Sequence, residues 1–368
     1  MSRQQTGERV HYIQWLRVFL ILLVVAHHAG QPYGPTGGAW PVDDPANSDV
    51  LLFFFAINAA FFMGFFFLLS GYFIERSYDR RGAAPFLWSR LIRLGIPLVV
   101  FVILVNGSSE WANSESARGY FDYLINDYVK GWRFEFAHLW FIAHLLIYAA
   151  LFVMWRRFTS APDPNHLPEP PRHLKILIFT VALASVSFLV RQVYPQDTWV
   201  RLFWTVPAEM AHLPQYASLF VVGVIAGRGR WFENINRHVA YTWFWIGVLA
   251  FLINGMFEIP GINLPGGYTA RDLWDFVDSF ICVGMILGLL ALFQRHFDKT
   301  GPWAQRLAGG VFGVYLLHMY VVIGLQFAIL EFEISALSKF ALVTVAGSII
   351  SFSIVDLFRR IRWLRLIL

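Results

Sequence analysis

The sequence has few charged residues and almost no cysteine. Aspartate, glutamate, lysine and arginine make up only 14% of its 368 residues, whereas a soluble domain carries about 25%. Its single cysteine, Cys282, cannot form an internal disulfide, which excludes a disulfide-stabilised secreted domain. The composition also excludes a disordered chain and a soluble basic nucleic-acid-binding protein, so we expect no nucleic-acid partner.

Several signatures of other protein classes are missing as well. No glycine-rich phosphate loop is present, and no His, Cys or acidic residues have the spacing of metal ligands, so we predict no metal site and no tightly bound cofactor. Alternating strands of about ten residues are also absent, which argues against an outer-membrane barrel.

Apolar residues are abundant: they make up 57% of the sequence and gather in long runs. A helix rises about 1.5 Å per residue, so about 20 apolar residues cross a hydrocarbon core of about 30 Å. We therefore predict an all-α, polytopic integral membrane helix bundle of about ten transmembrane helices, forming a single stand-alone domain over residues 1–368. The predicted spans are 12–30, 51–74, 90–107, 137–155, 174–192, 213–228, 240–257, 273–294, 308–330 and 337–358.

The loops between these spans differ in charge. When alternate loops are placed on opposite sides, 21 of the 29 basic residues fall on one side, whereas the 24 acidic residues divide 8 to 16 the other way. The positive-inside rule makes the basic side cytoplasmic, so we predict that both termini and a proline-rich loop near 158–173 lie in the cytoplasm and that the protein resides in the cell inner membrane. We interpret the first span as a retained helix, because Arg17 interrupts it and no clear signal-peptide cleavage site follows.

Ionisable residues inside a membrane span are costly and therefore candidates for function. Arg17 and His28 lie in the first span, eleven residues apart, which places them on one stripe of the helix about 16 Å apart. An arginine near the inner surface can bind a phosphate, and an imidazole deeper in the membrane can act as a general base. Alternatively, Arg17 only extends to the interface and His28 is a polar group at the helix end.

Five segments together resemble the membrane acyltransferase-3 family, which includes O-antigen acetylases and enzymes that modify periplasmic glucans. These segments occur in the family's order, and the resemblance extends over nearly the whole chain. They are Arg17 followed by ten residues and His28, then FFFLLSGYFI (65–74), RLIRLGIP (90–97), HLWFIAHLLIY (138–148) and YLLHMY (315–320).

The resemblance implies an integral membrane O-acyltransferase. Such an enzyme moves an acetyl or succinyl group from a cytoplasmic acyl-CoA, which is a co-substrate, to a hydroxyl of a carbohydrate or other envelope acceptor. His28 would then be the general base or a transient acyl carrier, and Arg17 would orient the donor. Arg90 and Arg93 would bind the donor's phosphates, although basic residues at inner helix ends also serve as membrane anchors.

Five further residues are candidates for supporting the active site, although each also has a purely structural interpretation. His138, Trp140 and His318 can orient His28, bind acceptor hydroxyls or stabilise the oxyanion, but a buried histidine can simply bond a neighbouring helix. Ser70 precedes Gly71, and small residues favour close helix packing over a direct role. Glu209 is a candidate for holding His28 in the correct tautomer.

A proton-coupled small-molecule transporter is the main alternative, because intramembrane Arg, His and Asp residues also mark ion pathways. Two similar halves with interrupted helices are then expected, and the sequence shows no such symmetry. Three aspartates at 272, 275 and 278 can bind an acceptor or cation, but the favourable helix dipole at an N-terminal turn explains them better. A non-catalytic scaffold leaves the aligned Arg17–His28 pair unexplained.

Overall fold

A computed structural model describes most of the chain. The described residues are 11–35, 40–114, 118–159, 163, 167–258, 264, 268–299 and 301–367. Arg3 and Arg9, which contribute to the basic side predicted above, lie outside them, as do residues 160–162 and 164–166 of the proline-rich loop.

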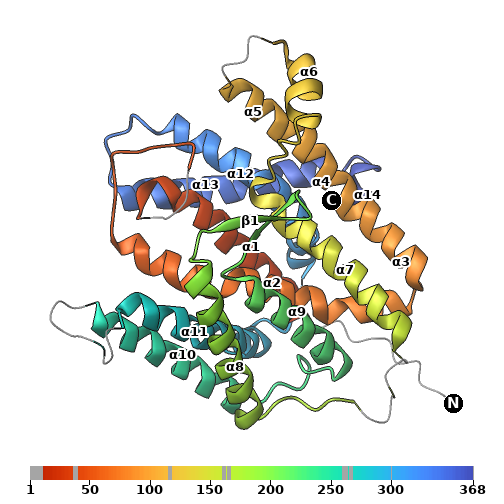
Figure 1. Cartoon of the computed structure of the whole chain (residues 1–368), viewed down its shortest axis with the longest axis vertical. Helices are drawn as coiled ribbons and strands as arrows, with labels where there is room; N and C mark the ends of the chain where they lie inside the picture. Colours follow the sequence, from red (N-terminus) through yellow and green to blue (C-terminus); the bar gives the residue numbers. More distant parts are fainter. Residues whose placement is uncertain are drawn as a thin grey trace.

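Long helices dominate the described residues, which confirms the predicted all-α membrane bundle (Figure 1). The long helices are α1 (Tyr12–Gly30), α2 (Val50–Asp79), α7 (Trp140–Phe158), α8 (His173–Val193), α9 (Leu213–Arg228), α10 (Arg237–Phe257), α11 (Ala270–His296), α12 (Pro302–Ala328) and α13 (Ala336–Phe358). The short ones are η1 (Gln31–Tyr33), α6 (Tyr120–Tyr123), η4 (Leu124–Val129), η5 (Ala137–Leu139) and α14 (Leu364–Ile367).

Among the described residues, nine helical segments are long and apolar enough to cross a membrane. They coincide with nine of the ten predicted spans. The remaining prediction, 213–228, is indeed helical as α9, but that helix has only 16 residues. Its rise of about 24 Å falls short of a hydrocarbon core of about 30 Å.

The third span is irregular. It consists of five consecutive pieces: α3 (Ala83–Arg90), η2 (Leu91–Gly95), α4 (Ile96–Val100), η3 (Phe101–Asn106) and α5 (Gly107–Asn113). Both η2 and η3 are π-helical. Pro97 lacks an N–H group and its ring crowds the preceding turn, so the wider turn at η2 lies where a regular helix is hardest to form. Arg90 and Arg93 lie at this turn.

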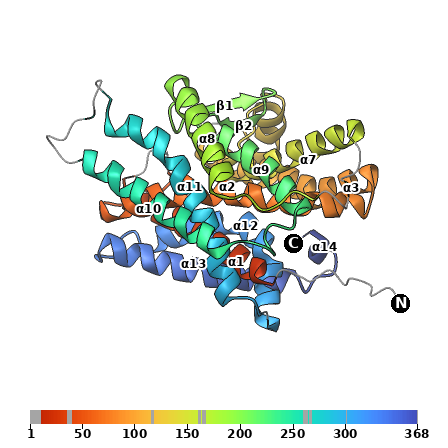
Figure 2. The ribbon, with the colours of Figure 1, turned by 90° about the horizontal axis from the view of Figure 1, so that it is seen from below.

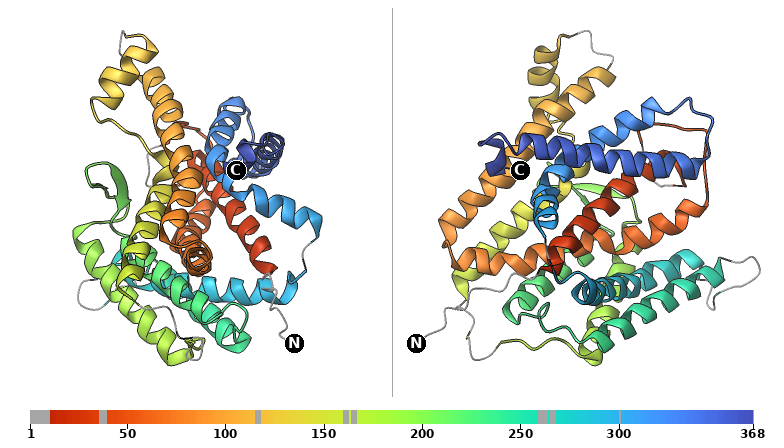
Figure 3. Two further views of the ribbon diagram at one scale, coloured as in Figure 1. Left: turned by 90° about the vertical axis from the view of Figure 1, so that its right-hand side faces the viewer. Right: turned by 180° about the vertical axis from the view of Figure 1, so that it is seen from behind.

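Helix α1 lies inside the bundle. It packs against α12 and α13 on one side and against α2 and α11 on the other, and Figures 2 and 3 show it between these helices. The close pairs α10–α11, α2–α9 and α12–α13 complete the arrangement. A polar residue on α1 is therefore surrounded by protein on several sides.

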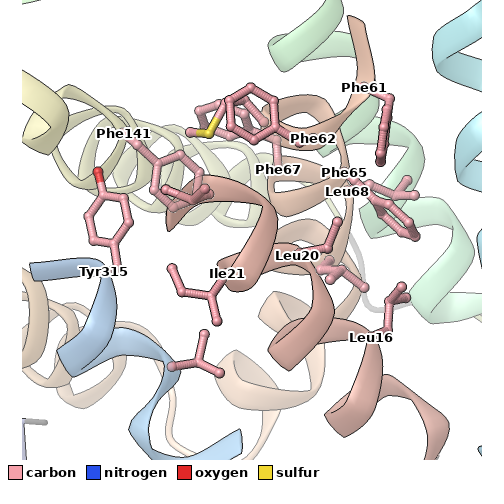
Figure 4. Packing of buried hydrophobic residues seen from close by; sticks show 14 of the residues in the cluster. Leu16, Leu20, Ile21, Phe61, Phe62, Phe65, Phe67, Leu68, Phe141 and Tyr315 are labelled. Carbon is pink, nitrogen blue, oxygen red and sulfur yellow. The ribbon is translucent and has the colours of Figure 1, made fainter. Parts of the chain in front are cut away.

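The apolar core lies where α1 meets α2, α7 and α12. Leu16, Leu20 and Ile21 of α1 are fully buried beside the phenylalanines of α2 (Figure 4). Phe141 of α7 meets the ring of Tyr315 of α12 edge-on, with 5.7 Å between centroids. Many large apolar side chains on the outer helix faces are exposed, as expected where lipid is the solvent.

Two glycines bring the backbones of α2 and α9 into contact. A Cβ atom on Gly71 would lie 2.2 Å from the carbonyl oxygen of Phe220, and one on Gly223 would lie 2.2 Å from that of Leu68. Both distances are far shorter than a van der Waals contact, so only glycine allows the two backbones to approach this closely. The structural interpretation of the segment at Ser70 is thus supported by its neighbour Gly71.

A short hairpin follows α8. Strands β1 (Trp199–Leu202) and β2 (Val206–Glu209) are antiparallel, and Trp199 pairs with Glu209. Phe203 and Trp204, in the three-residue turn between them, have positive φ angles of 50° and 58°. The hairpin places Glu209 directly before α9.

Candidate active site

His28 lies in the last turn of α1, between aromatic and polar neighbours. Its ring stacks on Trp40, with 5.7 Å between centroids and an interplanar angle of 24°. Trp40 Nε1 donates to Gln326 Oε1 at 2.9 Å, and Gln326 Nε2 donates to the backbone oxygen of His28 at 2.9 Å. Gln326 therefore ties the end of α1 to the indole that covers His28.

The hydrogen bonds around His28 and His318 define the tautomers of both rings. His318 Nδ1 lies 3.1 Å from the carbonyl of Val314 and 2.8 Å from that of Tyr315. Carbonyls only accept, so His318 Nδ1 carries the proton, and Nε2 of the neutral ring is an acceptor. That Nε2 lies 3.1 Å from His28 Nδ1, which is also 3.0 Å from the carbonyl of Val24.

His28 Nδ1 therefore faces two acceptors and must carry a proton itself. In a neutral imidazole the other nitrogen, Nε2, then holds a free lone pair. It has no hydrogen-bond partner within the described part of the chain, and His28 lines a cavity. The arrangement leaves a positioned proton acceptor on the cavity wall.

His138 lies next to this pair. Its ring centroid is 5.1 Å from that of His318, and the hydroxyl of Tyr315 donates to its backbone oxygen. The side chain is 6% exposed, yet neither ring nitrogen has a hydrogen-bond partner among the described residues. Both ring nitrogens are buried, and the backbone carbonyls of Tyr315 and Leu316 lie close to the ring, so an N–H of His138 reaches a ligand only if the ring turns towards the cavity.

A cavity of about 730 Å³ joins His28 and His138 to the other candidate residues at this end of the bundle. Trp140 lines it, stacked on Tyr216 with 5.4 Å between centroids, and so does Glu209. The volume falls within the range of small-molecule sites. His318 lies behind the wall, fully buried.

Glu209 does not contact His28, which corrects the idea that it fixes the tautomer of that residue. Its Oε2 lies 2.8 Å from His212 Nδ1, and its Oε1 accepts from the backbone N–H of Asp197 at 3.0 Å. Burial raises the pKa of Glu209, but His212 and the Asp197 N–H outweigh burial and leave that pKa below its ordinary value. The pKa of Asp197 is raised by burial and by the nearby Glu209.

Arg17, Arg90 and Arg93, hereafter the arginine group, lie at the opposite end of α1 from His28. Arg93 is close enough to Arg17 and Arg90 to repel both electrostatically. Arg90 lies over the ring of Phe86 at 5.2 Å. None of the three has an acidic partner within the described ranges, so their positive charge is uncompensated.

Other arginines at the same end are compensated. Arg228 donates to both carboxylate oxygens of Glu75 at 2.7 to 2.9 Å. Arg156 lies 3.8 Å from Glu75 and 3.3 Å from Asp79. These arginines join α2 to α7 and α9, so the structure separates arginines that hold helices together from the arginine group.

The stripe of α1 between Arg17 and His28 is packed shut. The cavity reaches Val24 on this helix, but Leu20 and Ile21 are fully buried in the core. A donor oriented by Arg17 would reach His28 most directly along this stripe. The structure shows no open passage there along the described residues.

Ser70 lies away from the cavity, and the three aspartates at the start of α11 have structural partners. Ser70 lies twelve residues beyond Asn58, the α2 residue that contacts His27, and it does not line the cavity. Asp272 forms a capping box with Thr269, as the helix-terminus interpretation predicts. Asp275 and Asp278 instead bind Arg191 of α8, with Arg191 Nη2 2.5 Å from Asp278 Oδ2.

Sequence reasoning missed three groups that surround the site: Trp40, Gln326 and the buried ion pair of Lys339 with Asp44. Lys339 Nζ lies 2.7 Å from Asp44 Oδ2 and 2.9 Å from the carbonyl of Leu330. The pair anchors the segment that carries Trp40. Gln326 and Lys339 are polar residues within predicted spans, a signal that could have identified them.

No group of three or more His, Cys, Asp or Glu side chains in the described ranges is arranged to hold a metal ion. His318 is instead bonded to His28 and to backbone carbonyls, and His27 is bonded to Asn58.

Comparisons with known proteins agree with the membrane helices of this chain. The family model described as "Acyltransferase domain", that of the acyltransferase-3 family, matches residues 10–360. The chain therefore belongs to the acyltransferase-3 family and is a multi-pass membrane protein.

The curated relatives that match the chain are distant in sequence. "Glucans biosynthesis protein C" of Salmonella typhi and of Salmonella typhimurium are each 25% identical to the chain over 233 residues, covering 59% of this chain and 58% of the relative. The protein of the same name from Salmonella schwarzengrund is 24% identical over the same length. The matched region thus spans little more than half the length of these relatives.

Proposed function

We propose that the protein is an O-acyltransferase that moves an acetyl or succinyl group from a cytoplasmic acyl-CoA to a hydroxyl of a carbohydrate, such as an envelope glycan. The family supports acyl transfer, and the name of the glucan-biosynthesis relatives supports a glycan acceptor. The observation that carries the proposal is the free lone pair of His28 Nε2 on the wall of the cavity.

In the proposed reaction, His28 Nε2 removes the proton of the acceptor hydroxyl. The hydroxyl oxygen attacks the thioester carbonyl, and the negative charge moves to the carbonyl oxygen. The tetrahedral intermediate then collapses, the C–S bond breaks, and the departing CoA sulfur takes the proton from His28. His318, bonded to His28 Nδ1, keeps the ring oriented throughout.

His138 lines the same cavity and can stabilise the oxyanion once its ring turns an N–H from the nearby carbonyls of Tyr315 and Leu316 towards the substrate. Trp140, which lines the same cavity, shapes the space around the reacting groups. Both roles require the substrates to bind within hydrogen-bond reach of these rings.

The arginine group suits the donor, because CoA carries several phosphates and planar guanidinium groups bind phosphate bidentately. Under the positive-inside rule this end faces the cytoplasm, where acyl-CoA is made. Leu20 and Ile21 close the direct route along α1. Binding of the donor must therefore move this packing, or bring the thioester to His28 beside α1.

The test uses the purified protein in lipid nanodiscs with isotopically labelled acetyl-CoA or succinyl-CoA and neutral oligosaccharides, with mass spectrometry of the products. We expect His28→Ala to lower acyl transfer by at least about 10²-fold, the usual contribution of a general base. The exposed His238→Ala is the matched control and retains activity. An active His28→Ala variant would contradict the assignment, and a labelled His28 peptide would indicate a covalent acyl-histidine route.

Substrate transport is the competing outcome of the same preparation. Proteoliposomes that move an oligosaccharide across the bilayer without any acyl donor, and that form no ester, would replace the proposal with a transporter.

A further inference from the structure

The cavity extends well beyond His28, and its far end has a different character. It is formed by the C-terminal end of α10, the first turns of α11 and the segment around the hairpin. Polar side chains from these elements face the same space as His28. Nothing in the proposed proton transfer uses them.

Asn254 is the first sign that this end receives a ligand. It lies on the membrane-spanning helix α10, is 6% exposed and lines the cavity. Its Oδ1 atom has no hydrogen-bond partner among the described residues. A buried amide oxygen without a partner is unfavourable unless a ligand or water supplies a donor.

Two carboxylates on the same wall are held in fixed positions. Asp278 Oδ2 is 2.5 Å from Arg191 Nη2, and its Oδ1 accepts from Ser279 Oγ at 3.3 Å. Glu209 is held by His212 and by the Asp197 N–H, as described above. Each carboxylate oxygen has further lone pairs, so both residues can accept hydrogen bonds from ligand hydroxyls without being reoriented.

Indole rings lie beside these acceptors. Trp140 meets Trp199 edge-on at 5.7 Å between centroids, and Trp274 lines the α11 side. Flat apolar faces next to rigid hydrogen-bond acceptors suit a ring that carries hydroxyl groups. A wholly apolar ligand would leave the acceptors without partners.

The net charge of the residues that line the cavity determines whether a neutral or an anionic hydroxyl-bearing ligand is favoured. The carboxylates of Asp197, Glu209 and Glu258 line the cavity against one arginine, Arg271, while the charge of a fourth, Asp278, is compensated by Arg191. An anionic ligand would be repelled by this surplus, whereas a neutral polyhydroxyl ligand would not.

We propose that this end of the cavity, with Asn254, Asp278 and Glu209 as hydrogen-bond acceptors, is a binding subsite for a neutral oligosaccharide and disfavours anionic ones. The assignment rests on the proposed function, because it makes the sugar the acyl acceptor. The subsite holds the acceptor so that one hydroxyl reaches His28.

The test measures binding without the donor and then turnover with it. The probes are a neutral glucose pentasaccharide and the same pentasaccharide oxidised to carry a uronate. Quenching of tryptophan fluorescence in nanodiscs reports binding, since Trp140, Trp199 and Trp274 line the cavity. We expect the neutral probe to bind and the uronate to bind at least several-fold more weakly.

Asn254→Leu keeps the side-chain size and removes the free oxygen. We expect it to weaken binding of the neutral probe and to raise its KM by roughly tenfold, the value of about one hydrogen bond, with the KM of the acyl-CoA unchanged. Glu258→Gln, at the exposed rim, should reduce discrimination against the uronate by roughly two- to fivefold. Glu331→Gln is the control, an exposed carboxylate that does not line the cavity.

The outcomes separate the two proposals. If Asn254→Leu binds the pentasaccharide as tightly as the wild type, or if the uronate binds equally well, the subsite is wrong while acyl transfer can stand. If the neutral probe binds and depends on Asn254 but no ester ever forms, the subsite stands and the proposed function fails.

Discussion

Two groups of charged residues lie at opposite ends of the bundle: the cluster around Arg191 is buried, whereas the arginine group is partly buried, with Arg93 exposed. Arg191 is enclosed by Asp278 at 2.5 Å, Asp275 at 3.5 Å and the carbonyl of Ala211 at 3.4 Å. The arginine group has no acidic neighbour among the described residues, and its members repel one another.

The difference separates residues that hold the fold together from residues that are free to bind. A charge neutralised inside the protein leaves little field for a ligand, and it contributes to structure as long as its partners remain. Arginines that repel each other are unfavourable in the empty protein and become favourable when an anion binds between them. The sequence alone does not reveal this distinction, because both groups read as basic residues near helix ends.

The largest expected effect comes from removing the compensated arginine. Arg191→Leu leaves Asp275 and Asp278 buried without their partner, and this should lower the free energy of unfolding by about 3–5 kcal/mol. Thermal unfolding in nanodiscs measures the effect. If Arg191→Leu is as stable as the wild type, the cluster is not a structural element.

A double variant sharpens this comparison. Arg191→Leu combined with Asp278→Leu removes the main pair together, so it should recover much of the lost stability, because replacing a buried pair by apolar residues is often nearly neutral. The same double variant removes Asp278, a proposed acceptor of the sugar subsite. Its saccharide binding should therefore stay weakened although its stability largely recovers.

The next effect concerns the arginine group. Arg93→Gln should weaken binding of CoA by about 10- to 100-fold, as expected for a charge-assisted hydrogen bond of about 1.5–3 kcal/mol. It should not lower stability without CoA, because it removes repulsion from Arg17 and Arg90. The shift of the melting temperature on adding CoA measures binding without catalysis.

Arg80→Gln serves as the matched control for that measurement. Arg80 is exposed at the same end, and its side chain donates to the carbonyl of Arg76. We expect it to keep the CoA-induced shift. Destabilisation of the CoA-free protein by Arg93→Gln would show that the group has a structural partner, which would contradict the comparison.

The smallest expected effect is a pH dependence at the hairpin. The pKa of Glu209 is lowered in the folded protein, so its contribution to stability is present at neutral pH and is lost as pH falls through that lowered pKa. Asp197 has a raised pKa, so its ionisation opposes folding as pH rises through that value.

Hydrogen exchange of the backbone N–H of Asp197, corrected for its intrinsic pH dependence, reports the loss of the bond to Glu209 at acidic pH. Glu209→Gln should remove this dependence. Protection that is unchanged in acid for the wild type would show that the carboxylate does not hold the hairpin.

Much of the fold followed from the sequence, because long apolar runs have few alternatives in a membrane. Nine predicted spans coincide with long helical segments of the described residues, and the boundaries of α1 agree with the prediction. α9 differs because hydropathy identifies an apolar helix but does not determine whether 16 residues cross the bilayer. The π-helical turns of the third span depend on packing and were not foreseen.

The site was only partly predictable. Helical periodicity placed Arg17 and His28 on one stripe, but periodicity carries no information about other helices. It therefore did not show that His318 bonds to His28, that Trp40 covers it, or that Leu20 and Ile21 close the stripe. Glu209 was considered as a partner for His28, yet the hairpin directs it to His212, a contact that only the tertiary fold determines.

The central claim is that His28 carries its proton on Nδ1 and leaves Nε2 unprotonated on the cavity wall. Nitrogen NMR of the protein labelled with ¹⁵N-histidine, with the His28 signals assigned by their loss in His28→Gln, tests it directly near neutral pH. The account predicts the Nδ1–H tautomer for His28 and the same tautomer for His318. Signals that show a proton on Nε2 of neutral His28 would contradict it.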